Sequence, residues 1–341
     1  MRTSTRLTLY ISVCGIVLWA AGASGFGMTR TPAAPGPRRK AARAASPHSR
    51  RAVIITTDCG VDADDQWDIA DLLLSPGIRV LAIIGTHAPG HTPAESAACA
   101  RDVIRRAQAY APPVFIGAGH PLQGARPQEN AGVRFLLRTA RKFSPTHRLT
   151  VVSIGAATDL GSALLAWPRL ARRIRIVAMG FKAEPAGGSE YNINNDPYAW
   201  RVIFHSRAPL VIGAANICER YLTLSAARAQ AMLGGRGPLG AWMAGVFTGF
   251  IRRHPHIARE FAPPGSWIEW DPITAAWLLG FTATRMRGGA HYHLACQCVR
   301  YSSGPGGRSV RWIVRVDRRR FWRDLRAKVS AAGSRHGGQK P

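Results

Sequence analysis

Four aspartates lie within eight residues of this 341-residue chain: Asp58, Asp62, Asp64 and Asp65. They follow an apolar, β-branched run at 53–57 that predicts a buried strand, and helical periodicity resumes after them. Loops of this kind bind ligands in open α/β sheets. Like charges this close repel unless a cation neutralises them, and carboxylate oxygens suit Ca²⁺ or Mg²⁺. The favourable field of a helix N-terminus explains one or two of these acids, but not Asp58 at the end of a buried strand.

Two later stretches also carry polar side chains that could do chemistry. Residues 190–197 (EYNINNDP) end on Asp196 and Pro197, which is typical of a helix cap. That cap leaves Glu190 and Asn192 unexplained. The second stretch, residues 270–272 (WDP), opens a predicted helix, where Asp271 is by itself an N-cap.

Strand and helix patterns alternate over most of the chain. This predicts a single α/β domain at residues 52–330, with a mainly parallel central sheet flanked by helices in a Rossmann-like core. The later part is expected to be helical at 225–280, followed by an antiparallel pair at 291–316 and a helix at 318–329. The predicted strands are 53–57, 79–86, 114–116, 149–154 and 174–179, and the predicted helices between them include 93–109 and 128–143.

The N-terminus has the pattern of an export signal. An apolar run at 7–21 follows two arginines and precedes small residues, which predicts a signal peptide at 1–25 or an uncleaved anchor. Residues 26–51, rich in Pro, Ala and Arg, are expected to be a disordered linker, and 331–341 a disordered tail. The expected location is therefore periplasmic or secreted, with membrane attachment only if the segment stays uncleaved.

Composition adds little about partners. The net charge of +27 is concentrated in the two ends of the chain, since residues 1–51 hold nine Arg or Lys and no acid. Basic tails can bind anionic surfaces, but no nucleic-acid-binding motif accompanies them, so we expect no specific nucleic acid. The five cysteines beyond the N-terminal run are too few for a disulfide scaffold, and packing is expected of each: Cys59, Cys99, Cys218, Cys296 and Cys298.

Four segments, in this order, resemble the inosine-uridine-preferring nucleoside hydrolases: TTDCGVDADD at 56–65, VVSIGAATDLGSAL at 151–164, MGFKAEPAGGSEYNINNDP at 179–197 and WDPITAAWLL at 270–279. The resemblance covers roughly residues 52–330, nearly all of the expected folded chain. It implies hydrolysis of the N-glycosidic bond of ribonucleosides to base and ribose, one bound Ca²⁺, a small-molecule nucleoside substrate and often a homo-oligomer.

The resemblance also assigns roles around the metal. Asp58 matches the aspartate that binds calcium and deprotonates the attacking water. Asp65 and Asp271 match further calcium ligands, and Ile154 matches a position that offers its backbone carbonyl.

On the sugar side, Glu190 and Asn192 match residues that grip the ribose, and Asp64 matches the aspartate that binds its hydroxyls. The aspartate loop is two residues longer than the commonest form, so either Asp62 or Asp64 could meet the ribose.

Two departures from the family pattern stand out. Thr56 replaces a common aspartate, and Trp270 replaces the histidine that can protonate the leaving base. A tryptophan there resembles the purine-preferring branch, where an indole can stack on the base, although ordinary core packing explains it equally well. Loop histidines that could border the site, such as His87, are expected to be solvated. The alternatives are the same fold acting on another ribosyl compound, or a non-catalytic binding protein that keeps the calcium loop.

Overall fold

The structure is a computed structural model that describes residues 50–303 and 306–337. The expected signal peptide, and the expected linker as far as residue 49, lie outside these ranges. Within them, no helix combines the length and the apolar character needed to cross a membrane.

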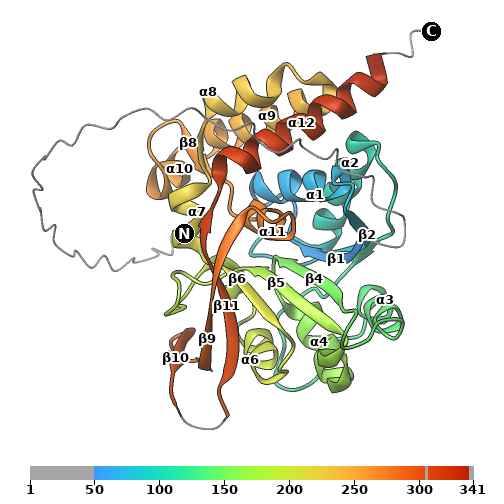
Figure 1. The fold of residues 1–341 in the computed structure, drawn as a ribbon, viewed down its shortest axis with the longest axis vertical. Helices are drawn as coiled ribbons and strands as arrows, with labels where there is room; N and C mark the ends of the chain where they lie inside the picture. Colours follow the sequence, from blue (N-terminus) through green and yellow to red (C-terminus); the bar gives the residue numbers. More distant parts are fainter. Residues whose placement is uncertain (1–49, 304–305, 338–341) are drawn as a thin grey trace, which may run out of the picture. The chain divides into compact units, whose positions relative to one another are not determined.

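One nine-stranded sheet organises the described chain, in the order β10-β9-β11-β6-β5-β4-β1-β2-β3 (Figure 1). Every neighbouring pair from β11 to β3 is parallel, while β9 and β10 run antiparallel at one side. The predicted mainly parallel sheet is therefore confirmed. The strands are β1 (Arg51–Thr57), β2 (Ile78–Gly85), β3 (Val114–Ile116), β4 (Leu149–Ile154), β5 (Ile174–Met179), β6 (Leu210–Gly213), β9 (Thr282–His293), β10 (Cys298–Tyr301) and β11 (Arg308–Val316).

Helices cover both faces of this sheet, because the buried strands are apolar on both sides. One apolar core lies under α1 (Asp64–Leu74), α2 (Pro93–Ala107), α9 (Gly237–Arg253) and α12 (Arg318–Gly337). The other lies under α3 (Ala131–Ala140), α4 (Thr158–Ala166) and α6 (Pro197–His205) (Figure 1). The shorter elements are α5 (Tyr191–Asn195), α7 (Ala215–Tyr221), α8 (Ala226–Ala229), α10 (Pro255–Phe261), α11 (Pro272–Leu278), a 3₁₀ turn at Pro168–Arg172, a π turn at Gln230–Gly234, and the two-stranded pair β7 (Thr223–Ser225) and β8 (Ser266–Ile268).

The expected tail at 331–341 is wrong for its first part, because α12 continues through Gly337 instead of ending near 329. Ala332 is buried against the core. Gly333 and Gly237 approach so closely that a Cβ on Gly237 would lie 2.8 Å from the Gly333 Cα. The helix is prolonged by this close packing, which a polar, charged sequence does not reveal.

Other boundaries also differ from the sequence expectation. Strand β6 was not predicted, because four apolar residues are too few to separate a strand from a buried helix segment. The segment expected to be helical contains β8, and the antiparallel pair begins at Thr282 rather than 291.

The expectation that all five cysteines only pack is wrong for four of them. Cys59 forms a disulfide with Cys99, and Cys296 forms one with Cys298, while Cys218 is buried and free. The first pair spans 40 residues of sequence. It forms because β1 and β2 are neighbours, which brings the loop after β1 against helix α2.

A buried charge joins α1 to α12. Asp71 on α1 is almost fully buried, and the Lys328 ammonium forms an ion pair with it. The same ammonium lies 2.7 Å from Asp324 Oδ2 and donates to Ser75 Oγ at 2.9 Å. Removing one partner of a buried pair leaves a buried charge without compensation.

We therefore expect Lys328→Met to lower the free energy of unfolding by about 3 kcal/mol, measured by urea denaturation. Lys142→Met, at an exposed lysine outside the ion pairs of the described residues, should change it by less than about 0.5 kcal/mol. Adding Asp71→Asn to Lys328→Met should recover part of the loss. A stability equal to that of the wild type in Lys328→Met would contradict this account of the contact between α1 and α12.

Candidate active site

The carboxyl ends of neighbouring parallel strands gather the predicted residues. Asp58 directly follows β1, and Thr57 at the end of β1 is in register with Ile154 at the end of β4. On the other side, Thr57 is in register with Gly85 at the end of β2. The backbone of Ile154 therefore lies beside the start of the acidic loop, as the resemblance implies.

Gly155 makes this close approach possible. A Cβ at this position would lie 2.6 Å from the backbone nitrogen of Asp58 and 2.8 Å from its Oδ1. Any side chain there would displace the Asp58 carboxylate, since real Cβ contacts are longer. The acidic loop therefore requires a glycine directly after β4.

Asp271 is brought to the same place from far along the chain. Its backbone N–H donates to Asp64 Oδ2 at 3.2 Å, across 207 residues of sequence. Its own carboxylate caps no helix nitrogen, so the interpretation of Asp271 as a simple N-cap of α11 is not supported. A second link ties the same two helices, because Asp68 accepts from Thr274 Oγ1 at 2.9 Å and from the backbone of Ala275 at 3.1 Å.

The acidic loop is held by its own hydrogen bonds. The Asp64 backbone donates to Asp62 Oδ1 at 3.1 Å, and the Thr57 hydroxyl donates to Asp65. Cys59 follows Asp58 directly, and its disulfide to Cys99 fixes the first turn of the loop to α2. These contacts order the loop within the protein itself.

The residues present fit a divalent cation. Asp62, Asp64 and Asp65 each place one oxygen within 4.8 Å of the others, and one buried oxygen of Asp58 has no hydrogen-bond partner. Among the described residues, no Lys, Arg or His forms an ion pair with any of them. An all-oxygen donor set of this kind suits a hard cation.

Electrostatics supports the same conclusion. Burial raises the pKa of Asp58 well above its ordinary value, and the charges of Asp62 and Glu190 raise it further. Burial and neighbouring carboxylates also raise the pKa of Asp65 and of Asp271. A bound cation lowers the free energy of buried, ionised carboxylates, because it offsets their mutual repulsion.

Glu190 and Asn192 lie at the start of α5, where the charge of Glu190 acts on Asp58. Glu190 caps this helix, accepting from the backbone of Asn192 at 3.1 Å and of Ile193 at 3.3 Å. Burial raises the pKa of Glu190 to about 7. The predicted cap at Asp196 is confirmed, since its Oδ1 accepts from the Ala199 backbone at 2.8 Å.

Trp270, which directly precedes Asp271 in the chain, is partly buried within an aromatic cluster. Its ring meets Trp267 and Phe261 edge to face, with centroids 6.2 and 6.3 Å apart. Phe261 is 45% exposed, so the cluster reaches the surface. The position therefore combines core packing with membership of a cluster that reaches the surface.

Sequence reasoning missed two side chains next to the acids. Glu269 is 0% exposed and neither of its carboxylate oxygens has a hydrogen-bond partner. Burial and then Asp62 raise its pKa well above the ordinary value. Tyr191 is 43% exposed, and burial and then the charge of Asp58 raise its pKa. The available signals were an acid at the end of an apolar segment and an aromatic residue within the polar run at 190–197.

His87 contradicts the expectation of a solvated histidine. It is 7% exposed, and its Nε2 lies 3.0 Å from Thr158 Oγ1. That hydroxyl donates in turn to Asp196 Oδ2 at 2.7 Å, so His87 Nε2 is the donor to Thr158. The buried acceptor Asp196 explains why this histidine turns inward.

These pKa shifts set the pH dependence of the cation-free protein. A carboxyl whose folded pKa is raised keeps its proton longer in the folded than in the unfolded state, so stability falls as pH rises above the unfolded pKa. For Glu190 that window runs from its ordinary pKa of 4.5 to about 7. In chelator we expect a lower melting temperature at pH 7.5 than at pH 5, and a larger stabilising effect of CaCl₂ at pH 7.5.

Asp65→Asn should reduce that calcium effect, whereas Asp102→Asn, on the distant surface of α2, should leave it unchanged. If the cation-free protein were more stable at pH 7.5 than at pH 5, the buried carboxyl groups would not have the raised pKa values described here.

The sequence matches the inosine-uridine preferring nucleoside hydrolase family over residues 53–323. The pyrimidine-specific ribonucleoside hydrolase RihA of Salmonella paratyphi A is 28% identical over 260 residues, covering 67% of this chain and 80% of that protein.

Solved structures share the fold. The purine-preferring ribonucleoside hydrolase from Gardnerella vaginalis superposes with a TM-score of 0.66 at 19% identity, covering 83% of this chain and 99% of that one. The type III effector protein XopQ, complexed with adenosine diphosphate ribose, gives 0.62 at 17% identity, covering 84% and 95%. With its acidic loop, parallel sheet and matching span, this chain belongs to the inosine-uridine preferring nucleoside hydrolase family and is a nucleoside hydrolase.

Proposed function

We propose that this enzyme hydrolyses ribonucleosides with Ca²⁺ as its metal and Asp58 as the base that accepts the proton of the attacking water. The observation that carries the proposal is the buried Asp58 oxygen without a partner, next to three clustered carboxylates. A buried, unpartnered carboxylate oxygen is free to take a proton from a water molecule held beside it.

Asp58, Asp65, Asp271 and the backbone carbonyl of Ile154 would hold the cation. Bound there, calcium supplies a positive centre that orients hydroxyl groups and makes a water molecule more acidic. The hydrogen bond from Asp271 to Asp64 supports this set, because it keeps the residues from α1 and α11 together.

The remaining polar residues of the site have side chains that can form hydrogen bonds with the sugar hydroxyls. Asp62 or Asp64 would accept hydrogen bonds from the ribose hydroxyls, with Glu190 and Asn192 on the other side. Positive charge develops on the sugar as the bond to the base breaks, and the surrounding carboxylates stabilise it. Holding sugar and water in one orientation removes much of the entropic barrier.

A bias toward purines is supported by Trp270. Its partly buried indole stands directly before Asp271, in a cluster that reaches the surface at Phe261. A larger base gains more from stacking on an aromatic face. The relatives named above include both a pyrimidine-specific and a purine-preferring enzyme, so the preference of this chain rests on its own side chains.

Two alternatives keep the same site. The enzyme could act on another ribosyl compound, an option favoured by the structural relative complexed with adenosine diphosphate ribose. A non-catalytic calcium-binding protein would need no unpartnered base at Asp58. Both are tested by one panel that contains five nucleosides and adenosine diphosphate ribose, with free ribose and calcium binding measured in parallel.

Export through the N-terminal segment is part of the proposal. The two disulfides, Cys59 with Cys99 and Cys296 with Cys298, support it, because disulfides persist mainly in oxidising compartments. The mass of the mature N-terminus in a periplasmic or secreted fraction tests it.

Asp58→Asn should lower ribose release from the preferred nucleoside at least 100-fold, within the range expected for loss of a general base. Asp102→Asn is the surface control. Release should also disappear with chelator and return with CaCl₂. Full turnover in Asp58→Asn would exclude Asp58 as the base.

Trp270→Ala should raise the Michaelis constant for inosine more than that for uridine, because the purine loses the larger stacking area. Trp242→Ala, on α9, controls for the loss of an indole elsewhere. An equal rise in the Michaelis constants for inosine and uridine would indicate that Trp270 only packs in the core.

A further inference from the structure

A concave region lies at the end of the sheet opposite the acidic loop. It encloses about 690 Å³ and is lined by residues at the amino ends of the parallel strands, including Arg51 at the start of β1 and Leu210 at the start of β6. The acidic loop, with Asp58, Asp62, Asp64 and Asp65, follows the carboxyl end of β1. The two regions are therefore separated by the length of the strands.

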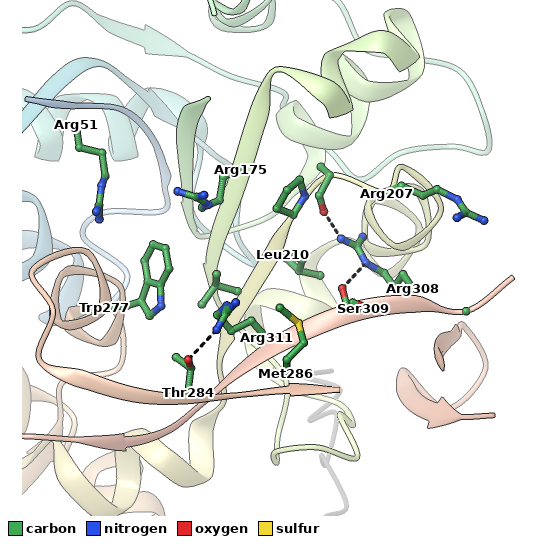
Figure 2. Close-up of a pocket in the computed structure, with 14 residues that line it drawn as sticks. Arg51, Arg175, Arg207, Leu210, Trp277, Thr284, Met286, Arg308, Ser309 and Arg311 are labelled. Atoms are coloured by element: carbon green, nitrogen blue, oxygen red, sulfur yellow. Dashed lines mark hydrogen bonds between the residues drawn. The ribbon is translucent and has the colours of Figure 1, made fainter. Parts of the chain in front are cut away.

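Three arginines converge in this region. Arg51, Arg175 and Arg311 come from β1, β5 and β11, and Figure 2 shows their guanidinium groups around the Trp277 ring. Arg51 and Arg175 lie 5.7 and 5.9 Å from the centroid of that ring. Arg311 is steadied by Thr284, to which it donates at 3.2 Å (Figure 2).

No Asp or Glu of the described residues neutralises these arginines. Among the described residues, none of the three takes part in an ion pair. The residues outside the described ranges contain no Asp or Glu at all. Burial lowers the pKa of Arg175, and the charges of Arg51, Arg148 and Arg311 lower it further. A bound anion from solution would offset the repulsion among these guanidinium groups.

Apolar side chains also line the hollow, beside Arg311, which is in register with Val211 on β6 and with Met286 on β9. Leu210, Val211 and Met286 line it, and Met286 is 50% exposed although it is a large hydrophobic residue. A volume of this size fits a small organic molecule rather than a single ion. The hollow thus offers one ligand both guanidinium groups and, next to Arg311, apolar side chains.

We infer that this hollow binds a small phosphate-bearing molecule, with the phosphate group between Arg51, Arg175 and Arg311 and the rest of the molecule against Met286. Guanidinium groups pair with phosphate oxygens through two parallel hydrogen bonds, which gives this anion an advantage over a spherical one. The site lies outside the acidic centre, and its ligand need not be a substrate.

An extended polyanion such as RNA is the less favoured occupant. The three guanidinium groups gather around one partly buried indole, so they form a compact cluster and not the long stripe of charge that follows a nucleic-acid backbone. Arg207, which also lines the region, points away from them (Figure 2). A compact anion reaches all three at once.

The test is calorimetric titration of the full chain in calcium-free buffer with inorganic phosphate, phenyl phosphate and, as the uncharged control, phenol. Phenyl phosphate carries no sugar, so the acidic centre does not select it. We expect Arg175→Gln and Arg311→Gln each to weaken phosphate and phenyl phosphate binding about tenfold. Arg134→Gln, at an exposed arginine on α3, removes the same charge elsewhere and should leave both unchanged.

Stability separates loss of binding from loss of folding. Because Arg175 is repelled by its neighbours, Arg175→Gln should melt at the same temperature as the wild type or higher. Phosphate should raise the melting temperature of the wild type and of Arg134→Gln more than that of Arg175→Gln. Ribose release should stay unchanged in Arg175→Gln.

The comparison of probes identifies the source of the phosphate group. Tighter binding of phenyl phosphate than of phosphate, lost in Met286→Ser, would assign a phosphate ester. Equal binding of the two, still dependent on Arg175, would assign free phosphate. Binding that ignores Arg175 and Arg311, or that is detected only with RNA, would overturn the inference.

Discussion

Mutual repulsion among buried carboxylates is the constraint on which the rest of this structure depends. Asp58, Asp64 and Asp65 are withdrawn from water at the end of one strand, and Asp271 joins them from another part of the chain. Burial and like charge both raise the free energy of such a cluster. The fold holds the acids together in three ways. Backbone N–H groups donate to Asp64 and Asp68, and the disulfide at Cys59 fixes the start of the loop. Gly155 has no side chain that would displace the Asp58 carboxylate.

The direction of the parallel strands divides the chemistry of the molecule. Carboxylates follow the carboxyl ends, whereas arginines such as Arg175 and Arg311 stand at or near the amino ends. The sheet thereby separates two charge clusters that would otherwise neutralise each other as ion pairs. Each cluster is left with unsatisfied charge, and each is suited to a ligand of the opposite sign.

Much of this arrangement could be predicted from local sequence. The alternation of strand and helix predicted the parallel sheet, and four acids after a buried strand predicted the acidic loop. Asp271 could be connected to that loop only through resemblance, since its partner Asp64 lies 207 residues away. Nothing local distinguishes an N-cap aspartate from one whose side chain serves a distant loop.

The features that escaped prediction depend on contacts made in three dimensions. The disulfide between Cys59 and Cys99 requires two neighbouring strands, and the length of α12 depends on its close approach to Gly237. His87 is inside because a hydroxyl and Asp196 lie beneath it. Glu269 was missed because an isolated acid in an apolar segment carries no pattern of its own.

The disulfide at Cys59 has a consequence for how a cation would enter. A loop that orders itself only around its metal loses conformational entropy at the moment of binding, and its affinity falls accordingly. Here the residue next to Asp58 is already cross-linked to α2, so this entropy is lost when the chain folds and oxidises. Oxidation during biogenesis, rather than encounter with the metal, is then the step that completes the shape of the coordinating loop.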